Sequence, residues 1–300
     1  MGKRLLVTGA AGFIASKLVQ RLRDSGDEVS EFDIARGQDI CNLKQVTEAI
    51  RGKDAVFHLA AVADLNYARV YPVRSMEINV QGTWNIAEAC RKQRGTVLFY
   101  ASTICVYGNQ EVHPVTEKSL PNPSEIYACS KLAGENVVKG YHLTYGLPYN
   151  IMRFATIYGP GTRPALGTHI FMGQALREEP ITVHGNGEQT RTLTHVNDLV
   201  DAILAVYKSG VTNDIFNMTA TEEISALRMA KDIKRLTGSK SEIVFIPQRI
   251  GQTFREEISA DHIRERVGWK ARIGWDDGLK DMLNWFMDTG QVKNIYKVTC

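Results

Sequence analysis

The chain lacks the features that would place a protein in a membrane. No apolar run within its 300 residues approaches the length of a bilayer span. The first residues are not typical of a secretory leader, because glycine-rich turn residues interrupt the apolar segment of MGKRLLVTGAAGFIA. We therefore expect a cytoplasmic protein with no membrane partner.

Cysteine is scarce, and its spacing shows no pairing. The five cysteines are Cys41, Cys90, Cys105, Cys129 and Cys300. This arrangement matches neither a disulfide framework nor a zinc site. We expect free thiols in a reducing compartment and no bound metal.

An excess of one charge is also lacking. The chain has 36 Lys and Arg against 33 Asp and Glu, for a formal charge of +3, and no basic cluster. A mixed, solvated surface explains this balance, so nucleic acid is not an expected partner. The composition, 44% hydrophobic and 23% charged, is typical of a globular protein with one large domain or two modest ones.

Short apolar segments alternate with helical patterns in the first half of the chain. The predicted strands are Lys3–Thr8, Glu28–Asp33, Ala55–Ala61, Val97–Ser102 and Tyr149–Phe154. They are mostly apolar at consecutive positions, as a parallel sheet covered on both faces requires. The predicted helices between them are Ala11–Ser25, Leu43–Ile50, Asn79–Arg94 and Tyr127–Tyr145. This alternation predicts an α/β fold with a doubly wound parallel sheet, a Rossmann fold.

The pattern changes after Tyr158-Gly159-Pro160-Gly161 to short mixed elements. Turn residues occur at 185–187 and at Gly274, and helical patterns resume at Asn197–Lys208, Ser225–Thr237, Ala260–Val267 and Asp277–Phe286. We predict a Rossmann domain over residues 1–165 and a second, smaller mixed α/β domain over 166–300. The chain is expected to return to the first domain near 190–215.

A glycine turn joins the first predicted strand to the first predicted helix. It begins at Gly9 and continues through Gly12, Phe13 and Ile14. A dinucleotide pyrophosphate needs such an unobstructed backbone at a positive helix end. Asp33 ends the second strand, 21 residues beyond Gly12, where an acid accepts hydrogen bonds from the ribose diol and repels a 2′-phosphate. Arg36 acts slightly in the opposite direction, but the pattern predicts NAD rather than NADP.

Tyr127 and Lys131 lie four residues apart at the start of a helical pattern, so they share one helix face. An ammonium at roughly 5 Å contributes about 3 kcal/mol at an effective dielectric of about 20, which lowers a phenol pKa by about two. The positive ring of oxidised NAD acts in the same direction. We predict a phenol that removes an alcohol proton during hydride transfer. A surface pair is the alternative; Ser102 and Thr103, at a strand's carboxyl end, favour the catalytic interpretation.

Several spaced motifs occur in a fixed order along nearly the whole chain. They are TGAAGFIA, Asp39-Ile40, HLAAVA at 58–63, NVQGTWNIAEAC at 79–90, ASTICVYGN at 101–109, YACSK, MRFATIYGPG at 152–161 and QTRTLTHVNDLV at 189–200. On these motifs the chain resembles the extended short-chain dehydrogenase/reductase family. Within it, the chain is most similar to the NAD-dependent branch of nucleotide-sugar epimerases and dehydratases, and to UDP-glucose 4-epimerases.

The resemblance implies a role for each matching residue. Thr103, Tyr127 and Lys131 would be catalytic and would also contact substrate or cofactor. The cofactor contacts it implies are Gly9, Gly12, Phe13, Ile14, Asp33, Asp39, Ile40, Leu59, Ala60, Ala61, Asn79 and Ser102. Thr156, Arg191 and Arg255 would bind a nucleoside-diphosphate sugar, the two arginines at its diphosphate; surface salt bridges are the alternative for Arg255. A homodimer through the helices at 79–94 and 127–145 is also implied.

The chain departs from the family pattern at two places. Thr156 stands where the family often has asparagine, and Ile104-Cys105 stand where dehydratases have Asp-Glu. The second departure favours epimerisation at C4 through a transient 4-keto sugar. A 4,6-dehydratase-type enzyme, a 4-keto reductase and a non-catalytic nucleotide-binding sensor remain alternatives. Cys105 and Cys129 are expected to be packing residues, with a catalytic thiol as the minority interpretation.

Overall fold

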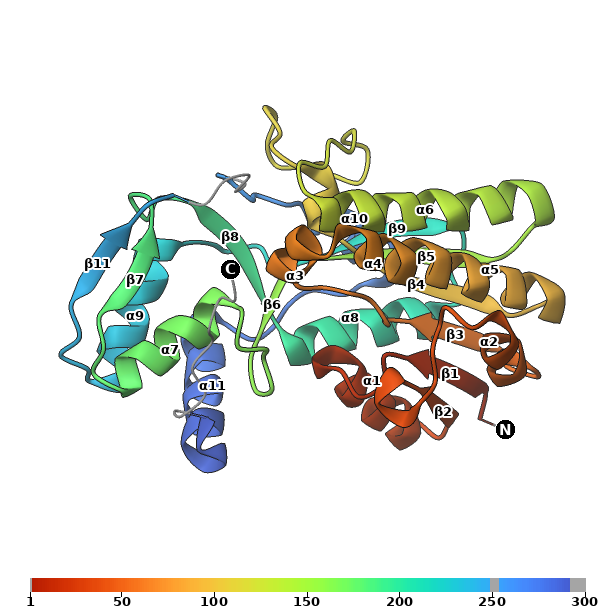
Figure 1. The fold of residues 1–300 in the computed structure, drawn as a ribbon, viewed down its shortest axis with the longest axis horizontal. Helices are drawn as coiled ribbons and strands as arrows, with labels where there is room; N and C mark the ends of the chain where they lie inside the picture. Colours follow the sequence, from red (N-terminus) through yellow and green to blue (C-terminus); the bar gives the residue numbers. More distant parts are fainter. Residues whose placement is uncertain (1, 249–253, 292–300) are drawn as a thin grey trace.

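The computed structural model describes residues 2–248 and 254–291, and its larger lobe is built on a six-stranded parallel sheet (Figure 1). The order is β2-β1-β3-β4-β5-β9. The strands are β1 (Arg4–Thr8), β2 (Glu28–Phe32), β3 (Ala55–His58), β4 (Val97–Thr103), β5 (Tyr149–Phe154) and β9 (Asp214–Met218). The predicted doubly wound sheet is confirmed. Because β2 and β3 lie on opposite sides of β1, the strand order changes direction there, which is where α/β sheets bind ligands.

Helices cover both faces of this sheet. One face carries α2 (Leu43–Ile50), α5 (Gly82–Gln93) and α6 (Ile126–Tyr145), and the other carries α1 (Phe13–Asp24), α8 (Val196–Ser209) and α10 (Asp261–Val267). Along β4, Leu98 and Tyr100 belong to the hydrophobic core under α2, α5 and α6, whereas Phe99 and Ala101 belong to the core under α1, α8 and α10. Burial on both faces explains why the strand is apolar at successive positions.

Short helical elements follow the strands at the carboxyl edge. After β3 come α3 (Leu65–Val70), α4 (Pro72–Met76) and a π-helical turn, η2 (Glu77–Gln81). The 3₁₀ turns η1 (Ile34–Arg36) and η3 (Ile104–Tyr107) follow β2 and β4. The helix predicted from Asn79 therefore begins in a π-helical turn rather than in an α-helix.

The smaller lobe has its own hydrophobic core, which includes Phe171, Ile233, Trp275 and Phe286. It contains α7 (Gly167–Leu176), β7 (Ile181–His184), α9 (Ala226–Thr237), β11 (Ile243–Ile246) and α11 (Trp275–Thr289). A three-stranded sheet, β10-β8-β6, connects the lobes. Its strands are β6 (Thr156–Tyr158), β8 (Thr190–His195) and β10 (Glu223–Ser225).

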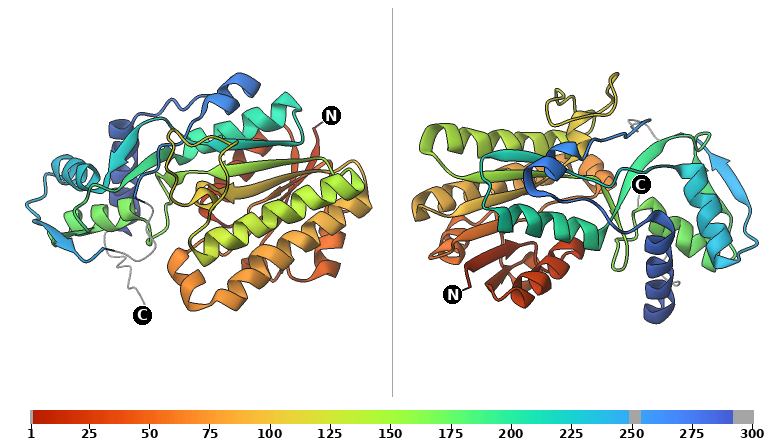
Figure 2. Two further views of the ribbon diagram at one scale, coloured as in Figure 1. Left: turned by 90° about the horizontal axis from the view of Figure 1, so that it is seen from above. Right: turned by 180° about the vertical axis from the view of Figure 1, so that it is seen from behind.

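The chain passes between the lobes several times (Figure 2). It enters the smaller lobe through β6, returns through β8 to α8 and β9, and later returns again to α10 before α11. The buried Asp198 on α8 fixes the last crossing, because its carboxylate accepts the backbone N–H groups of Arg272 and Ile273 at 2.9–3.1 Å. Among the described residues, no helix is both long and apolar enough for a bilayer.

Candidate active site

A cavity of about 700 Å³ opens at the carboxyl ends of the central strands. Most of the candidate site residues predicted from the sequence line this cavity. These are Gly9, Gly12, Phe13, Ile14, Asp33, Asp39, Ile40, Leu59, Ala60, Ala61, Ser102, Thr103, Tyr127, Lys131 and Thr156. Residues that are as much as 147 positions apart (156 − 9) in the sequence therefore share one cavity.

The glycine turn forms one end of this cavity. Gly9 has φ +69°, and a Cβ there would lie 2.8 Å from the Ala60 Cα, so a side chain is excluded. Gly12 precedes α1 in extended conformation, and Phe13 and Ile14 in the first helical turn line the cavity. The unobstructed backbone and the positive helix end fit a pyrophosphate.

The Asp33 carboxylate is held in place beside this turn. Its Oδ2 accepts the Ala11 N–H at 3.0 Å, and its Oδ1 accepts the Ala35 N–H at 2.8 Å. Arg36, the group that would favour a 2′-phosphate, is instead ion-paired with Glu31. The charge at this end of the cavity therefore fits the ribose diol of NAD.

Asn79 lies behind the cavity wall and does not line it. Its Oδ1 accepts the Val62 N–H at 2.7 Å, and its Nδ2 donates to the Val62 carbonyl at 2.9 Å and to Ser130 Oγ at 2.8 Å. Val62 does line the cavity. Asn79, which the resemblance implies as a cofactor contact, thus positions a loop that forms the wall and joins it to α6.

The three predicted catalytic residues come together at the centre of the cavity. Tyr127 and Lys131 lie on the first turns of α6, and Thr103 ends β4. Thr103 Oγ1 accepts the Cys105 N–H at 3.2 Å, and its hydroxyl hydrogen-bonds Tyr127, which lowers the phenol pKa. A hydroxyl bound to this phenol is well placed to orient a substrate alcohol.

Burial controls the charge of both groups on α6. It raises the pKa of Tyr127 to about 12, with a further contribution from Cys105, while Arg163 and the Thr103 hydrogen bond oppose the rise. Burial lowers the pKa of Lys131 to about 7, and the charge of Glu135 opposes that change.

This corrects one expectation from the sequence. We expected the Lys131 ammonium to lower the phenol pKa, but the cation that does so among the residues that the structure describes is Arg163. Desolvation has the largest effect on the phenol pKa, and burial also weakens the charge of the neighbouring Lys131 by lowering its pKa. The four-residue spacing predicted the placement of the pair and not the direction of the pKa shift.

The two predicted diphosphate arginines lie outside the cavity lining. Arg191 Nε is 3.3 Å from Glu256 Oε1, and both residues affect the pKa of the partly buried Cys105 thiol, which Glu256 raises and Arg191 lowers. Arg191 therefore lies toward the Cys105 end of the cavity. Arg255 is about half exposed and pairs with Glu223 and Glu257, which is the surface salt-bridge alternative left open by the sequence.

Sequence reasoning missed Arg163 and Glu135. Arg163 lies in the turn after β6, lines the cavity and lowers the pKa of Tyr127. Its signal was an arginine within a Gly- and Pro-rich segment that follows a strand. Glu135 is completely buried one helical turn after Lys131. Its signal was an acid four residues beyond a predicted catalytic lysine.

Comparisons with known proteins agree with this geometry. A model of the NAD dependent epimerase/dehydratase family matches residues 5–219. The UDP-N-acetyl-alpha-D-glucosaminuronate decarboxylase of Bacillus cytotoxicus is 32% identical, over 96% of this chain and 99% of its own. The structure of UDP-glucose 4-epimerase from Thermotoga maritima with UDP-glucose has a TM-score of 0.92 and 28% identity, covering 95% of this chain and 99% of that one. The Thermus thermophilus UDP-glucose 4-epimerase complex with NAD has a TM-score of 0.87 at 28% identity, with the same coverage.

Proposed function

The chain belongs to the NAD-dependent epimerase/dehydratase family, and from this premise we propose that it inverts the configuration at C4 of a nucleoside-diphosphate sugar. Members of this family are enzymes that act on nucleotide sugars with NAD. What has to be argued from this chain's own residues is which reaction follows the oxidation at C4.

The observation that carries the proposal is the pair of residues after Thr103. Ile104 is buried and cannot transfer a proton. Burial raises the pKa of the Cys105 thiol to about 11, so the thiol stays protonated at neutral pH and is not a base. Of the described residues that line the cavity, the carboxylates are Asp33 and Asp39, which follow β2 at the glycine-turn end. This arrangement suits a reaction that needs no acid–base pair beyond the tyrosine.

Each catalytic side chain then has one task. Thr103 orients the C4 hydroxyl, and the Tyr127 phenol, in its deprotonated form, removes the hydroxyl proton. NAD, when bound, supplies the hydride acceptor and a positive ring that favours the phenolate. Lys131 would hold the nicotinamide ribose. The 4-keto sugar would turn within the cavity so that the bound cofactor could supply hydride to its opposite face, and Tyr127 would return the proton to the oxygen at C4.

Turnover in deuterated water tests the proposal. Hydride that leaves C4 and returns to it never exchanges with solvent, so the epimerised product should carry no deuterium at C4 or C5. The products of a panel of nucleotide sugars would be followed by NMR. Deuterium at C5, or loss of the C6 hydroxyl, would contradict epimerisation, because both require a proton to be removed from C5.

A 4,6-dehydratase-type reaction is the second candidate, and Glu256 is the observation that favours it. The charge of this buried carboxyl raises the pKa of the Cys105 thiol. Burial in turn raises the pKa of the Glu256 carboxyl itself, as suits a general acid. Its Oε2 has no hydrogen-bond partner among the described residues. Glu256→Gln distinguishes the reactions, because a dehydratase that uses this acid should lose product formation whereas an epimerase should retain it.

We also propose that the protein is a homodimer through the outer face of α5 and α6. Trp84, Leu143 and Tyr145 are 57%, 82% and 59% exposed there, and the Trp84 Nε1–H donates to Tyr141 across the two helices. Large apolar side chains gathered on one face are typical of subunit contacts. Sedimentation should give twice the chain mass for the wild type and a monomer for Leu143→Glu; a monomeric wild type would refute the dimer.

A further inference from the structure

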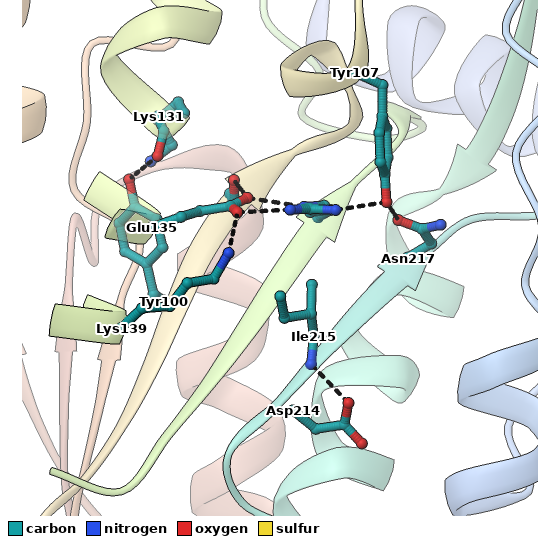
Figure 3. A network of polar contacts seen from close by, with 10 residues as sticks. Tyr100, Tyr107, Lys131, Glu135, Lys139, Asp214, Ile215 and Asn217 are labelled. Atoms are coloured by element: carbon teal, nitrogen blue, oxygen red, sulfur yellow. Dashed lines mark hydrogen bonds and ion pairs between the residues drawn. The ribbon is translucent and has the colours of Figure 1, made fainter. Parts of the chain in front are cut away.

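A buried polar network lies next to Lys131, between α6 and the strands β4, β5 and β9 (Figure 3). At its centre, the Glu135 carboxylate on α6 accepts two hydrogen bonds from Arg153 on β5, Nε to Oε1 at 2.9 Å and Nη2 to Oε2 at 2.7 Å. Glu135 Oε1 also accepts the Ser102 hydroxyl at 2.6 Å. Arg153 Nη1 donates to Tyr107 at 2.7 Å, and that phenol donates to Asn217 at the same distance. The Glu135 side chain is thus completely buried, and both of its carboxylate oxygens accept hydrogen bonds.

The charge of the same carboxylate raises the pKa of Lys131, which lies one helical turn earlier on α6. The Lys131 Nζ lies 4.6 Å from the centre of the Tyr100 ring, and the Tyr100 hydroxyl donates to the Lys131 carbonyl at 3.2 Å. Gly134 permits this contact, because a Cβ there would lie 2.1 Å from that hydroxyl. Titratable groups that interact with Lys131 include Glu135 on its own helix, Tyr100 on β4 and His58 on β3, whose pKa burial lowers to about 3. Of these, Glu135 is the anion.

We propose that Glu135 is a positioning residue of the active site, which holds Ser102 at the end of β4 and places a fixed negative charge one helical turn from Lys131, the residue that would bind the cofactor. The proposal rests on the assignment of Lys131 to the nicotinamide ribose made above. Arg153 completes the arrangement, because a carboxylate held by a two-pronged guanidinium keeps one orientation. The two hydrogen bonds from Arg153 and the one from Ser102 are all 2.6–2.9 Å long, so the carboxylate is held in one position, unlike a carboxylate in an exposed surface ion pair.

The charge of Lys131 offers a readout that a purely structural role would not affect. With a pKa of about 7, Lys131 is about half protonated at neutral pH. If losing the Glu135 charge weakens proton binding by Lys131 about tenfold, the charged fraction near neutral pH falls about fivefold. Lowering the pH restores that charge, so a defect in cofactor binding that arises this way should disappear in acid.

Glu135→Gln alone leaves the buried Arg153 without its anion and is therefore expected to destabilise the fold. The double variant Glu135→Gln/Arg153→Met removes both charges together, which buried pairs tolerate far better. Lys139→Met is the matched control. Its ammonium also lies near Glu135, at 3.6 Å from Oε2, but the side chain is 31% exposed and belongs to the outer part of α6.

The experiment is calorimetric titration of the full-length protein with NAD between about pH 5 and about pH 9, after thermal unfolding has shown that each variant is folded. Wild type and Lys139→Met should lose affinity together as the pH rises through about 7. The double variant should bind NAD about fivefold more weakly near neutral pH and should recover at the acid end.

Two results would overturn the proposal. A folded double variant that follows the wild-type curve would show that Glu135 does not control Lys131. A loss of affinity that is equal at every pH would show a structural effect only. The titration needs no sugar, so its outcome is separate from that of the proposed function: a wild type with the expected pH dependence but no turnover would refute epimerisation alone.

Discussion

Two backbone N–H groups hold the Asp33 carboxylate in the cavity, so its charge acts at a fixed point. We expect NAD to bind at least about tenfold more tightly than NADP, a difference of about 1.4 kcal/mol. Asp33→Asn keeps an acceptor but removes the charge, and should narrow this preference. Calorimetry with both cofactors measures it; equal affinities in the wild type would mean that Arg36 dominates despite its pairing with Glu31.

Tyr127→Phe removes only the hydroxyl that we propose as the proton-transfer group. Turnover should fall by at least about a hundredfold, the contribution typical of a general acid–base group. NAD affinity and thermal stability should change little, because the ring remains. Lys131→Ala should instead weaken both turnover and NAD binding. Near-wild-type activity in Tyr127→Phe would rule out the assignment of this phenol as the base.

Arg163→Gln tests the electrostatics of the base. Tyr127 must lose its proton to act, so the rate rises as the pH approaches its pKa, which burial has raised and Arg163 partly lowers. Without Arg163 that pKa rises further, and the ascending limb of the rate profile should move to higher pH. Arg228→Gln, which removes an exposed arginine paired with Glu222, is the control. If the ascending limb of the Arg163→Gln profile stayed at the wild-type pH, the charge of Arg163 would not control the Tyr127 pKa.

How far the sequence predicted the site depended on whether the signal was local. The glycine turn, Asp33 and the Tyr127/Lys131 pair each follow from neighbouring residues, and all line one cavity. Arg163 affects the Tyr127 pKa from 36 positions away in the sequence (163 − 127), in a turn that follows the strand β6, which pairs with the distant strand β8. The direction of the phenol pKa shift was equally non-local, because it arises from burial.

At the scale of elements, long or strongly patterned segments were predicted best. The strand Tyr149–Phe154 and the helix Leu43–Ile50 have the predicted bounds. The three-residue strands β6 and β10 were missed, since a run that short carries no periodicity. Helix α7 was missed because Gly167–Leu176 is mostly buried and has no clear polar face.

The turn between β1 and α1 can be tested with a pair of matched glycines. Gly9 and Gly210 have φ of +69° and +71°, but only Gly9 has backbone within 3.0 Å of an added Cβ. Each change to alanine should cost about 1–2 kcal/mol of stability in urea unfolding, since both demand a left-handed residue. Gly9→Ala should lose more than that and should also lose NAD binding. Equal behaviour of the two variants would mean that the turn can relax.

At the scale of the whole molecule, Asp198 joins the lobes through two backbone N–H groups. Asp198→Ala leaves both without a partner and should lower the free energy of unfolding by about 2–4 kcal/mol. Asp201→Ala, on the same helix, removes a half-exposed pair with Arg21 and should cost less than about 1 kcal/mol. Chemical denaturation of both variants measures the difference. Similar losses of unfolding free energy in the two variants would show that the hydrogen bonds of Asp198 do not stabilise the connection between the lobes.

The repeated crossing of the chain between two separate hydrophobic cores has a consequence for protein engineering. Along the sequence, core residues alternate between the larger lobe, the smaller lobe at 158–193, the larger lobe at 196–218, the smaller lobe at 224–233, the larger lobe at 263–269 and the smaller lobe at 275–286. A chimera that takes its smaller lobe from a relative therefore cannot be made with a single junction. It must exchange three segments at once and keep two segments of the recipient, α8 with β9 and the segment that contains α10, or it would mix residues from two proteins within one core.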